Sequence, residues 1–366
     1  MKDSIKIAKD FTVANWKILR PQLLFSNDNW PTANQVFEDR IYSRFFNPIE
    51  RIKSIKKNEG EGFSIALISV VLLEFLAAFE LGKIYRIQKE GLTPNEYYSG
   101  IRLLKSFLRS DKLFNQHFVS NNKIQIFYEN IRCGLVHEAR TLENDVIISN
   151  ESNKNTKQNS IYFEDNGEWR LNRDLMLETI KTFVENYKER LLNNELHLRS
   201  KFIIKMDDIA GFKHVWYFVY GSNLLEEQLR TRLSDIDENY LQRERCSLKG
   251  YEFTYNKRST DGTSKANLIK TENGIVEGVA ILILEEKLDE FINEYEKGYV
   301  KTEIQIQTDN NKNENPQFTF KAYTCISDNI ISVPPADDYV SKIIKGAFEN
   351  DLPQEYIKKY LENVHL

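Results

Sequence analysis

The chain has 366 residues, of which 41% are hydrophobic and 28% are charged, and its formal net charge is −4. This composition is typical of a soluble globular protein, and the length is sufficient for two domains. Residues 211–366 are acidic, which excludes nucleic-acid binding through an overall positive field there, and residues 1–210 are nearly neutral, so any RNA contact would be local. Three cysteines without regular spacing argue against a disulfide framework or structural zinc, so we expect a cytoplasmic protein.

Helical spacing dominates the first half of the chain. In the first 60 residues, Pro21, Pro31 and Pro48 are expected to break any long element. Helices are then predicted in four segments, at about 62–91, 93–110, 122–139 and 173–194.

The segment 63–81 is long and apolar enough to resemble a membrane span. It contains Glu74 and Glu80, and no aromatic belt or basic flank marks a membrane boundary. Because carboxylates are costly at the centre of a bilayer, we predict a helix at the centre of a bundle and no membrane contact.

Two short β-like runs, 145–149 and 160–163, are predicted to form a hairpin around an exposed loop at 150–159. Residues 202–204 are apolar and are predicted to be a short strand or docking element near the domain junction. We therefore expect a helical domain at 1–205, a linker at 206–213 and a second domain at 214–366.

Short strands predominate after residue 214. They are predicted at 215–220, 251–255, 274–284, 299–307 and 317–324, with a loop at 309–315. The expected fold is a small mixed or barrel-like α+β sheet surrounded by helices.

The third predicted helix ends in an Arg-x4-His motif formed by Arg132 and His137. In a helical bundle this motif resembles the RNA-cleaving motif of the HEPN superfamily. The resemblance implies a homodimer in which histidine moves a proton from a ribose 2′-hydroxyl and arginine stabilises the phosphorane, without metal. The alternative is that both residues cap a helix end and pair with Glu129, Glu138 or Glu143.

An apolar strand running into Tyr220, Gly221, Ser222 and Asn223 is the most informative feature of the second half. A helical pattern follows at once, so backbone N–H groups in this turn can face an anionic ligand. A purely structural turn is the alternative.

Four later segments follow this turn in the order seen in γ-glutamylcyclotransferases: 253–267, 278–280, 292–299 and 334–357. The resemblance covers about residues 214–366. It implies an enzyme that converts a γ-glutamyl amide into 5-oxoproline and a free amine, the substrate's own α-amine attacking its side-chain carbonyl.

The resemblance also assigns residues to the reaction. Glu296 is expected to be the general acid and base, with its pKa raised by an apolar site whose walls are Tyr295 and Tyr299. The turn from Tyr220 to Asn223 would hold the γ-glutamyl head, and Tyr339 would close over it. Alternatively, Glu296 is one surface glutamate of an acidic helix, a register with Leu288 and Asp289 moves the role elsewhere, and Tyr339 is only a packing aromatic.

No metal or cofactor is predicted. The histidines at 117, 197, 214 and 365 lack ligand-type spacing, and no glycine-rich nucleotide loop is present. Three functions therefore remain open: a cyclotransferase, a HEPN-type ribonuclease acting as a toxin or antiviral effector under control of the second domain, and a non-catalytic ligand-binding and dimerisation module. The leaving amine of the γ-glutamyl substrate stays undetermined.

Overall fold

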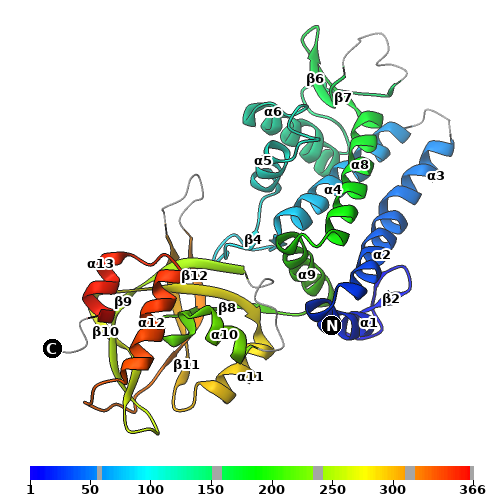
Figure 1. Ribbon diagram of the computed structural model, residues 1–366. Helices are drawn as coiled ribbons and strands as arrows, with labels where there is room; N and C mark the ends of the chain where they lie inside the picture. Colours follow the sequence, from blue (N-terminus) through cyan, green and yellow to red (C-terminus); the bar gives the residue numbers. More distant parts are fainter. Residues whose placement is uncertain (56–59, 151–158, 234–241, 310–317, 363–366) are drawn as a thin grey trace. The chain divides into compact units, whose positions relative to one another are not determined.

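The computed structural model describes residues 1–55, 60–150, 159–233, 242–309 and 318–362 (Figure 1). The chain forms two compact units. The helical unit comprises Met1–Tyr85 and Tyr97–Ala210, and the barrel unit comprises Arg86–Glu96 and Gly211–Leu366. The division differs from the expected boundaries at 205 and 214, because a helix continues to Ala210 and an inner segment of the first half belongs to the barrel unit.

In its described residues, the helical unit is built from α-helices, the 3-10 helix η1 and two π-helical stretches, η2 and η3. Its helices are α1 (Val13–Phe25), η1 (Asn27–Asn29), α2 (Trp30–Ile41), η2 (Tyr42–Phe46), α3 (Asn47–Ile55), α4 (Glu61–Leu81), α5 (Gly100–Ser110), α6 (Asn121–Ile126), η3 (Phe127–Glu138), α8 (Arg173–Leu192) and α9 (Leu196–Ala210). Short ladders join β1 (Lys6–Ala8) to β2 (Phe11–Thr12), and β3 (Ile84–Tyr85) to β4 (Glu96–Tyr97). Residues 202–204 lie inside α9, so the predicted strand there is wrong.

The prediction that prolines break the N-terminal helices is wrong. Pro31 lies in the first turn of α2, where a missing N–H costs nothing. Pro48 is the second residue of α3, and only Asn47 separates it from the π-helical turn η2, whose wider hydrogen-bond spacing accommodates the lost donor. Helices α2, η2 and α3 therefore follow one another without a break. Pro21 lies inside α1.

Helix α4 lies at the centre of the bundle, as predicted. It packs against α3, α5, α8 and α9, and its Phe79 ring contacts the rings of Phe37 and Phe202. Among the described residues it is the one helix long and apolar enough to cross a membrane, and 61% of that apolar stretch is buried inside the protein. Gly82, with φ of 64°, ends the helix in the left-handed conformation, nine residues before the predicted end.

The small sheet of the helical unit has the order β5-β7-β6, formed by β5 (Val146–Ile148), β6 (Tyr162–Asp165) and β7 (Glu168–Asn172). β5 and β6 do not pair, so the predicted hairpin is wrong. The hairpin joins β6 to β7 through Asn166 and Gly167, both with positive φ, which is the backbone that a two-residue hairpin turn requires. Residues 151–158 of the predicted loop lie outside the described residues.

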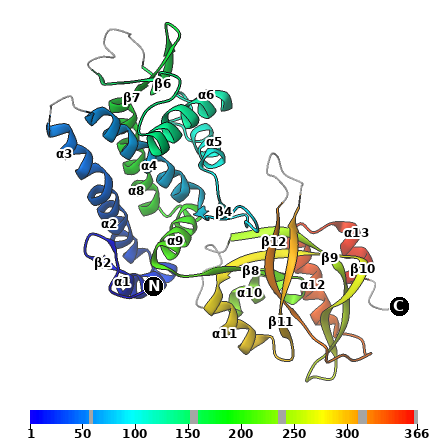
Figure 2. The same ribbon diagram turned by 180° about the vertical axis from the view of Figure 1, so that it is seen from behind.

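The barrel unit contains a closed five-stranded barrel of order β10-β8-β12-β11-β9. The strands are β8 (His214–Val219), β9 (Gln242–Arg258), β10 (Ser264–Leu284), β11 (Val300–Thr308) and β12 (Thr319–Ile326). Its helices are η4 (Ser222–Leu224), α10 (Glu226–Arg232), α11 (Glu285–Tyr295), α12 (Asp337–Glu349), α13 (Gln354–Tyr356) and η6 (Ile357–Glu362), and Figures 1 and 2 show α10, α11 and α12 outside the strands. The predicted barrel-like sheet with surrounding helices is confirmed, although β9 and β10 are much longer than the predicted strands.

Residues 86–96 leave the helical half and fold with the barrel. Asn95 is buried, and its Oδ1 accepts a hydrogen bond of 3.1 Å from Nε1 of the buried Trp216 in β8. Thr93 donates to the same oxygen, and Arg86 pairs with Glu96 at 2.6 Å. Helix α5 consequently begins at Gly100 rather than at Thr93, where the Thr-Pro signal had placed it.

Candidate active site

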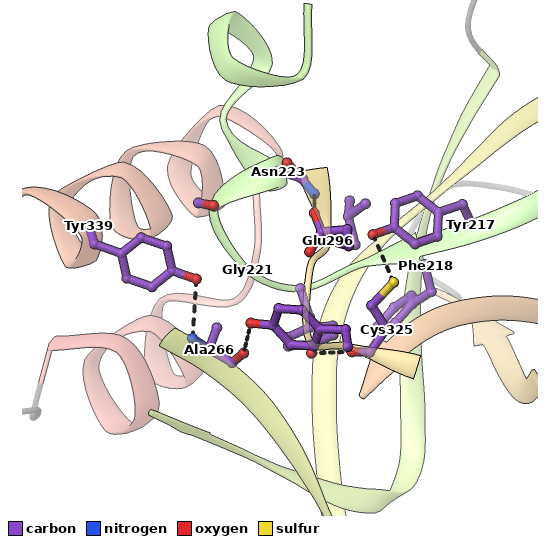
Figure 3. A pocket seen from close by; sticks show the side chains of 12 residues that line it. Tyr217, Phe218, Gly221, Asn223, Ala266, Glu296, Cys325 and Tyr339 are labelled. Carbon is purple, nitrogen blue, oxygen red and sulfur yellow. Dashed lines mark hydrogen bonds between the residues drawn. The ribbon is translucent and has the colours of Figure 1, made fainter. Parts of the chain in front are cut away.

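A pocket lies in the barrel unit where β8 ends (Figure 3). Strands β8, β10 and β12, the loop after β8, the turn after α11 and helix α12 all contribute to it. The lining residues are Tyr217, Phe218, Val219, Tyr220, Gly221, Ser222, Asn223, Ala266, Glu296, Tyr299, Cys325 and Tyr339. The structure therefore brings Glu296, the Tyr220–Asn223 turn and Tyr339 together from positions up to 119 residues apart.

The turn after β8 is held tightly on two sides. A Cβ on Gly221 would lie 3.2 Å from Cβ of Ala266 on β10, so the turn passes close to that strand. On the other side, a Cβ on Gly346 of α12 would lie 2.3 Å from the backbone nitrogen of Leu225. Glycine at these two positions lets the backbone of the turn pack directly between the barrel and α12.

Glu296 follows the last residue of α11, and its side chain is only 11% exposed. Asn223 Nδ2 donates a 2.8 Å hydrogen bond to Oε1 of the carboxylate, and Arg232 Nη1 lies 3.4 Å from the same oxygen. Burial raises the pKa of Glu296, whereas the Asn223 hydrogen bond and the cations Arg232 and Lys257 oppose the rise. Asp289, from the alternative register, lies on the outside of α11 and pairs with Lys301.

Arg232 fixes the orientation of the Asn223 amide. Arg232 Nη1 donates a 2.8 Å hydrogen bond to Asn223 Oδ1, and a guanidinium has no acceptor, so the amide oxygen must face it. The amide NH2 group then points toward Glu296 (Figure 3). Arg232 thus has two effects on Glu296: it orients the Asn223 amide that donates to the carboxylate, and it places its own positive charge beside the carboxylate.

The tyrosines of the pocket bracket Ala266. The Tyr339 hydroxyl accepts a hydrogen bond from the backbone N–H of Ala266, and the Tyr299 hydroxyl donates to its carbonyl at 2.6 Å (Figure 3). Burial raises the pKa of Tyr339 to about 12, so its hydroxyl is neutral at physiological pH. Tyr295, expected as a wall, instead contacts Phe291 and Arg232 and is not a lining residue.

Two other lining residues have structural contacts. The Tyr220 hydroxyl donates to the carbonyl oxygen of Cys325, so this tyrosine ties the end of β8 to β12. Burial raises the pKa of the Cys325 thiol to about 12, and the thiolate needed for nucleophilic catalysis is therefore absent at neutral pH. Among the pocket side chains, this leaves Glu296 as the group suited to proton transfer.

A hydrogen-bond network holds the turn that carries Glu296. Tyr299 N–H donates to the Glu296 carbonyl, and Gly298 has a φ of 81°, which favours glycine. Ser327 Oγ donates to the Gly298 carbonyl, and the buried side chain of Asn267 makes two hydrogen bonds to the Ser327 backbone. The Ser-Lys-Ala-Asn segment at 264–267 thus positions the site through both Ala266 and Asn267.

In the helical unit, Arg132 and His137 lie on η3. Arg132 Nε pairs with Glu74 Oε2 of α4 at 2.9 Å, and its guanidinium lies 5.5 Å from the Tyr128 ring centre. His137 is exposed near the end of the helix. Arg132 therefore pairs with Glu74 and not with Glu129, Glu138 or Glu143, the partners that the alternative interpretation predicted. Among the described residues, no group of three or more His, Cys, Asp and Glu side chains is arranged to hold a metal.

No family model and no curated protein matches this chain. Solved structures similar to part of it include a γ-glutamyl cyclotransferase (25% identity, covering 42% of this chain and 89% of that chain, TM-score 0.35). A γ-glutamyl cyclotransferase specific to glutathione from yeast is 14% identical (41% and 95%, TM-score 0.32), and YkqA from Bacillus subtilis is 19% identical (43% and 58%, TM-score 0.35). Because these scores are low, the function proposed below rests on the residues of the pocket.

Proposed function

We propose that the barrel unit is a cyclotransferase that releases 5-oxoproline and a free amine from a γ-glutamyl amide. The observation that carries the proposal is Glu296: a carboxylate with a raised pKa, buried in a pocket and held there by Asn223. Its place beside the Tyr-Gly-Ser-Asn turn agrees with the resemblance in the sequence.

In the proposed reaction, the substrate's α-amine attacks its own γ-carbonyl carbon. Glu296 takes a proton from the attacking nitrogen and returns it to the departing nitrogen as the amide C–N bond breaks. Backbone N–H groups of the turn at 221–223 would hold the γ-glutamyl head and stabilise the oxyanion, each donor contributing about 3 kcal/mol. No cofactor takes part in these steps.

The proposal is tested by mass spectrometry of 5-oxoproline released from γ-glutamyl amino acids, glutathione and γ-glutamyl-lysine. Release identifies the chemistry, and the preferred substrate identifies the leaving amine. If none of these compounds yields 5-oxoproline but the protein binds one of them, the pocket is a ligand-binding module without catalysis.

Arg232→Met is expected to move the acid limb of the kcat/KM profile to higher pH. Glu296 must be ionised to accept a proton, so kcat/KM rises as pH increases through its pKa. Arg232 opposes the rise of that pKa, and removing the guanidinium therefore raises it further. The pH dependence of 5-oxoproline release measures the shift. Arg230→Met changes an exposed arginine of the same helix and should leave the profile unchanged; an unshifted limb in Arg232→Met would contradict the assignment.

A second candidate function, metal-independent RNA cleavage, is favoured by the π-helical backbone of η3. Backbone hydrogen bonds join residues five apart in a π-helix, so Arg132 and His137 lie on roughly the same side of η3, with Arg132 half-buried against Glu74 and His137 exposed. In an α-helix they would point about 140° apart. We propose that this face acts on RNA in a homodimer that brings two Arg/His pairs together.

Arg132→Ala and His137→Ala are each expected to relieve growth arrest caused by overexpression and to abolish RNA cleavage by the purified protein. The reason is that either change removes the transition-state cation or the proton-transfer group. Gel analysis of RNA measures the cleavage, with Arg102→Ala, an exposed arginine on α5, as the control. Intact RNA with the unaltered protein would remove this candidate.

A further inference from the structure

Lys257, near the end of β9, is a buried cation without a counter-ion. The residue is only 9% exposed, and its ammonium makes no hydrogen bond or ion pair to any residue that the structure describes. Its contact is with the face of Tyr299, 4.8 Å from the ring centre. Burying a charge without a partner is costly, so such a group calls for a physical reason.

The cross-strand neighbour of Lys257 increases this cost. Lys257 lies directly opposite Lys265 of β10, and like charges in that arrangement repel. Lys265 is compensated by Asp261, at 3.0 Å, and by the Tyr339 ring at 4.6 Å. Burial and Lys265 lower the pKa of Lys257, whereas Glu296 and Asp261 raise it. A local arrangement that opposes stability is typical of functional sites.

The ammonium lies against the turn that carries Glu296. A Cβ on Gly298 would be 3.5 Å from Lys257 Nζ, so the cation rests on the 296–299 turn. That turn supplies both Glu296 and Tyr299 to the pocket. Of the two cations that act on Glu296, Arg232 is already hydrogen-bonded to Asn223, and Lys257 remains uncommitted.

We propose that Lys257 binds the α-carboxylate of the γ-glutamyl head. This inference rests on the proposed cyclotransferase chemistry, in which the α-amine must lie within hydrogen-bond distance of Glu296. The α-amine and the α-carboxylate share one carbon atom, so a substrate whose amine meets Glu296 carries its carboxylate into the neighbourhood of Lys257. The bound anion then supplies the counter-ion that the protein itself lacks.

The first test is binding of two lactams that differ by one carboxylate: 5-oxoproline, which carries it, and 2-pyrrolidinone, which does not. NMR titration of the wild type is expected to show tighter binding of 5-oxoproline. Lys257→Met should weaken 5-oxoproline binding about 10- to 100-fold, the effect of one hydrogen bond to a charged group, and leave 2-pyrrolidinone unchanged. Lys257→Arg should retain part of the preference. Lys301→Met is the matched control, because Lys301 also lies over a tyrosine ring, that of Tyr323, but its ammonium is already paired with Asp289 on the outside of α11.

Steady-state turnover provides a second, independent test of the role of Lys257. The wild type should cyclise γ-glutamyl-alanine with a much lower KM than 4-aminobutanoyl-alanine. The second compound keeps the attacking amine, the amide and the alanine, but lacks the carboxylate on the carbon that bears the amine. Lys257→Met should raise the KM for γ-glutamyl-alanine alone, with kcat little changed. If neither compound is cyclised, the cyclotransferase proposal fails while the lactam titration still decides whether Lys257 recognises a carboxylate.

Two results would overturn the inference. One is equal affinity of the wild type for both lactams, and the other is an equal loss of affinity for both lactams in Lys257→Met. Misfolding does not confuse the result, because replacing an unpaired buried cation by an apolar side chain of similar length is expected to keep or raise the melting temperature. Loss of 5-oxoproline affinity together with an unchanged or higher melting temperature is a combination that a merely structural lysine would not produce.

Discussion

Glu296→Gln is expected to lower kcat for 5-oxoproline release by a factor of about 10² to 10⁴, the usual contribution of a positioned general acid and base. Glutamine is nearly isosteric and can still accept the Asn223 hydrogen bond through its amide oxygen, so the pocket keeps its shape. What is lost is the ability to exchange a proton. Steady-state kinetics with the preferred γ-glutamyl amide measures the change, and the thermal unfolding temperature checks that the fold is intact.

Glu294→Gln is the matched control for this experiment. Glu294 is an exposed glutamate near the end of α11, two residues before Glu296, and its change should leave kcat within a factor of about two. Full activity in Glu296→Gln would remove this carboxylate from the mechanism. A large loss in both variants would indicate damage to the helix rather than to the chemistry.

Gly346→Ala is expected to reduce both stability and activity. The added Cβ would lie 2.3 Å from the Leu225 nitrogen and 2.5 Å from the Leu224 carbonyl carbon, so backbone rather than a flexible side chain must move. Overpacking of this kind lowers the free energy of unfolding by about 1–3 kcal/mol. Because the displaced segment follows Asn223 directly, kcat for 5-oxoproline release should fall as well.

Chemical denaturation and steady-state kinetics measure the two effects of Gly346→Ala. Ser341→Ala, at an exposed position of the same helix, should change the free energy of unfolding by no more than about 0.5 kcal/mol. Wild-type stability and activity in Gly346→Ala would show that α12 can separate from the turn without consequence, contrary to the close packing described above.

Local patterns in the sequence predicted the elements that need little tertiary information. The central helix α4, the bundle helix α8 and the barrel-like sheet follow from hydrophobic spacing, and the ordered segments predicted that Glu296, the Tyr220–Asn223 turn and Tyr339 belong together. The predictions were wrong where the local backbone conformation of one residue or one turn determines whether a helix continues or ends. The left-handed Gly82 ended a helix early, and the π-turn before Pro48 kept a helical course that proline was expected to end.

The two cations that act on Glu296 could not be predicted in the same way. Arg232 is the last residue of a short helix and Lys257 is the penultimate residue of a long strand, and nothing in their sequence neighbours distinguishes them from surface cations. Arg232 contacts the carboxylate, and Lys257 lies against the 296–299 turn, only because the barrel closes and that turn folds back over β9. What distinguishes Lys257 is the energetic cost of its position: its charge is buried and it lies opposite another lysine on the paired strand. Both features can be recognised only once strand register and burial are known.

The excursion of residues 86–96 means that the barrel unit is not encoded by one uninterrupted stretch of the chain. A fragment beginning at Gly211 would lack Asn95 and leave the indole N–H of Trp216 buried without its acceptor, at a cost of about 1–3 kcal/mol. Trp216 belongs to the strand that leads into the Gly-Ser-Asn turn. The helical half therefore cannot be deleted, exchanged or shuffled as a cassette without removing a piece of the other unit, and the natural boundaries for dissecting this protein are three positions along the chain rather than one.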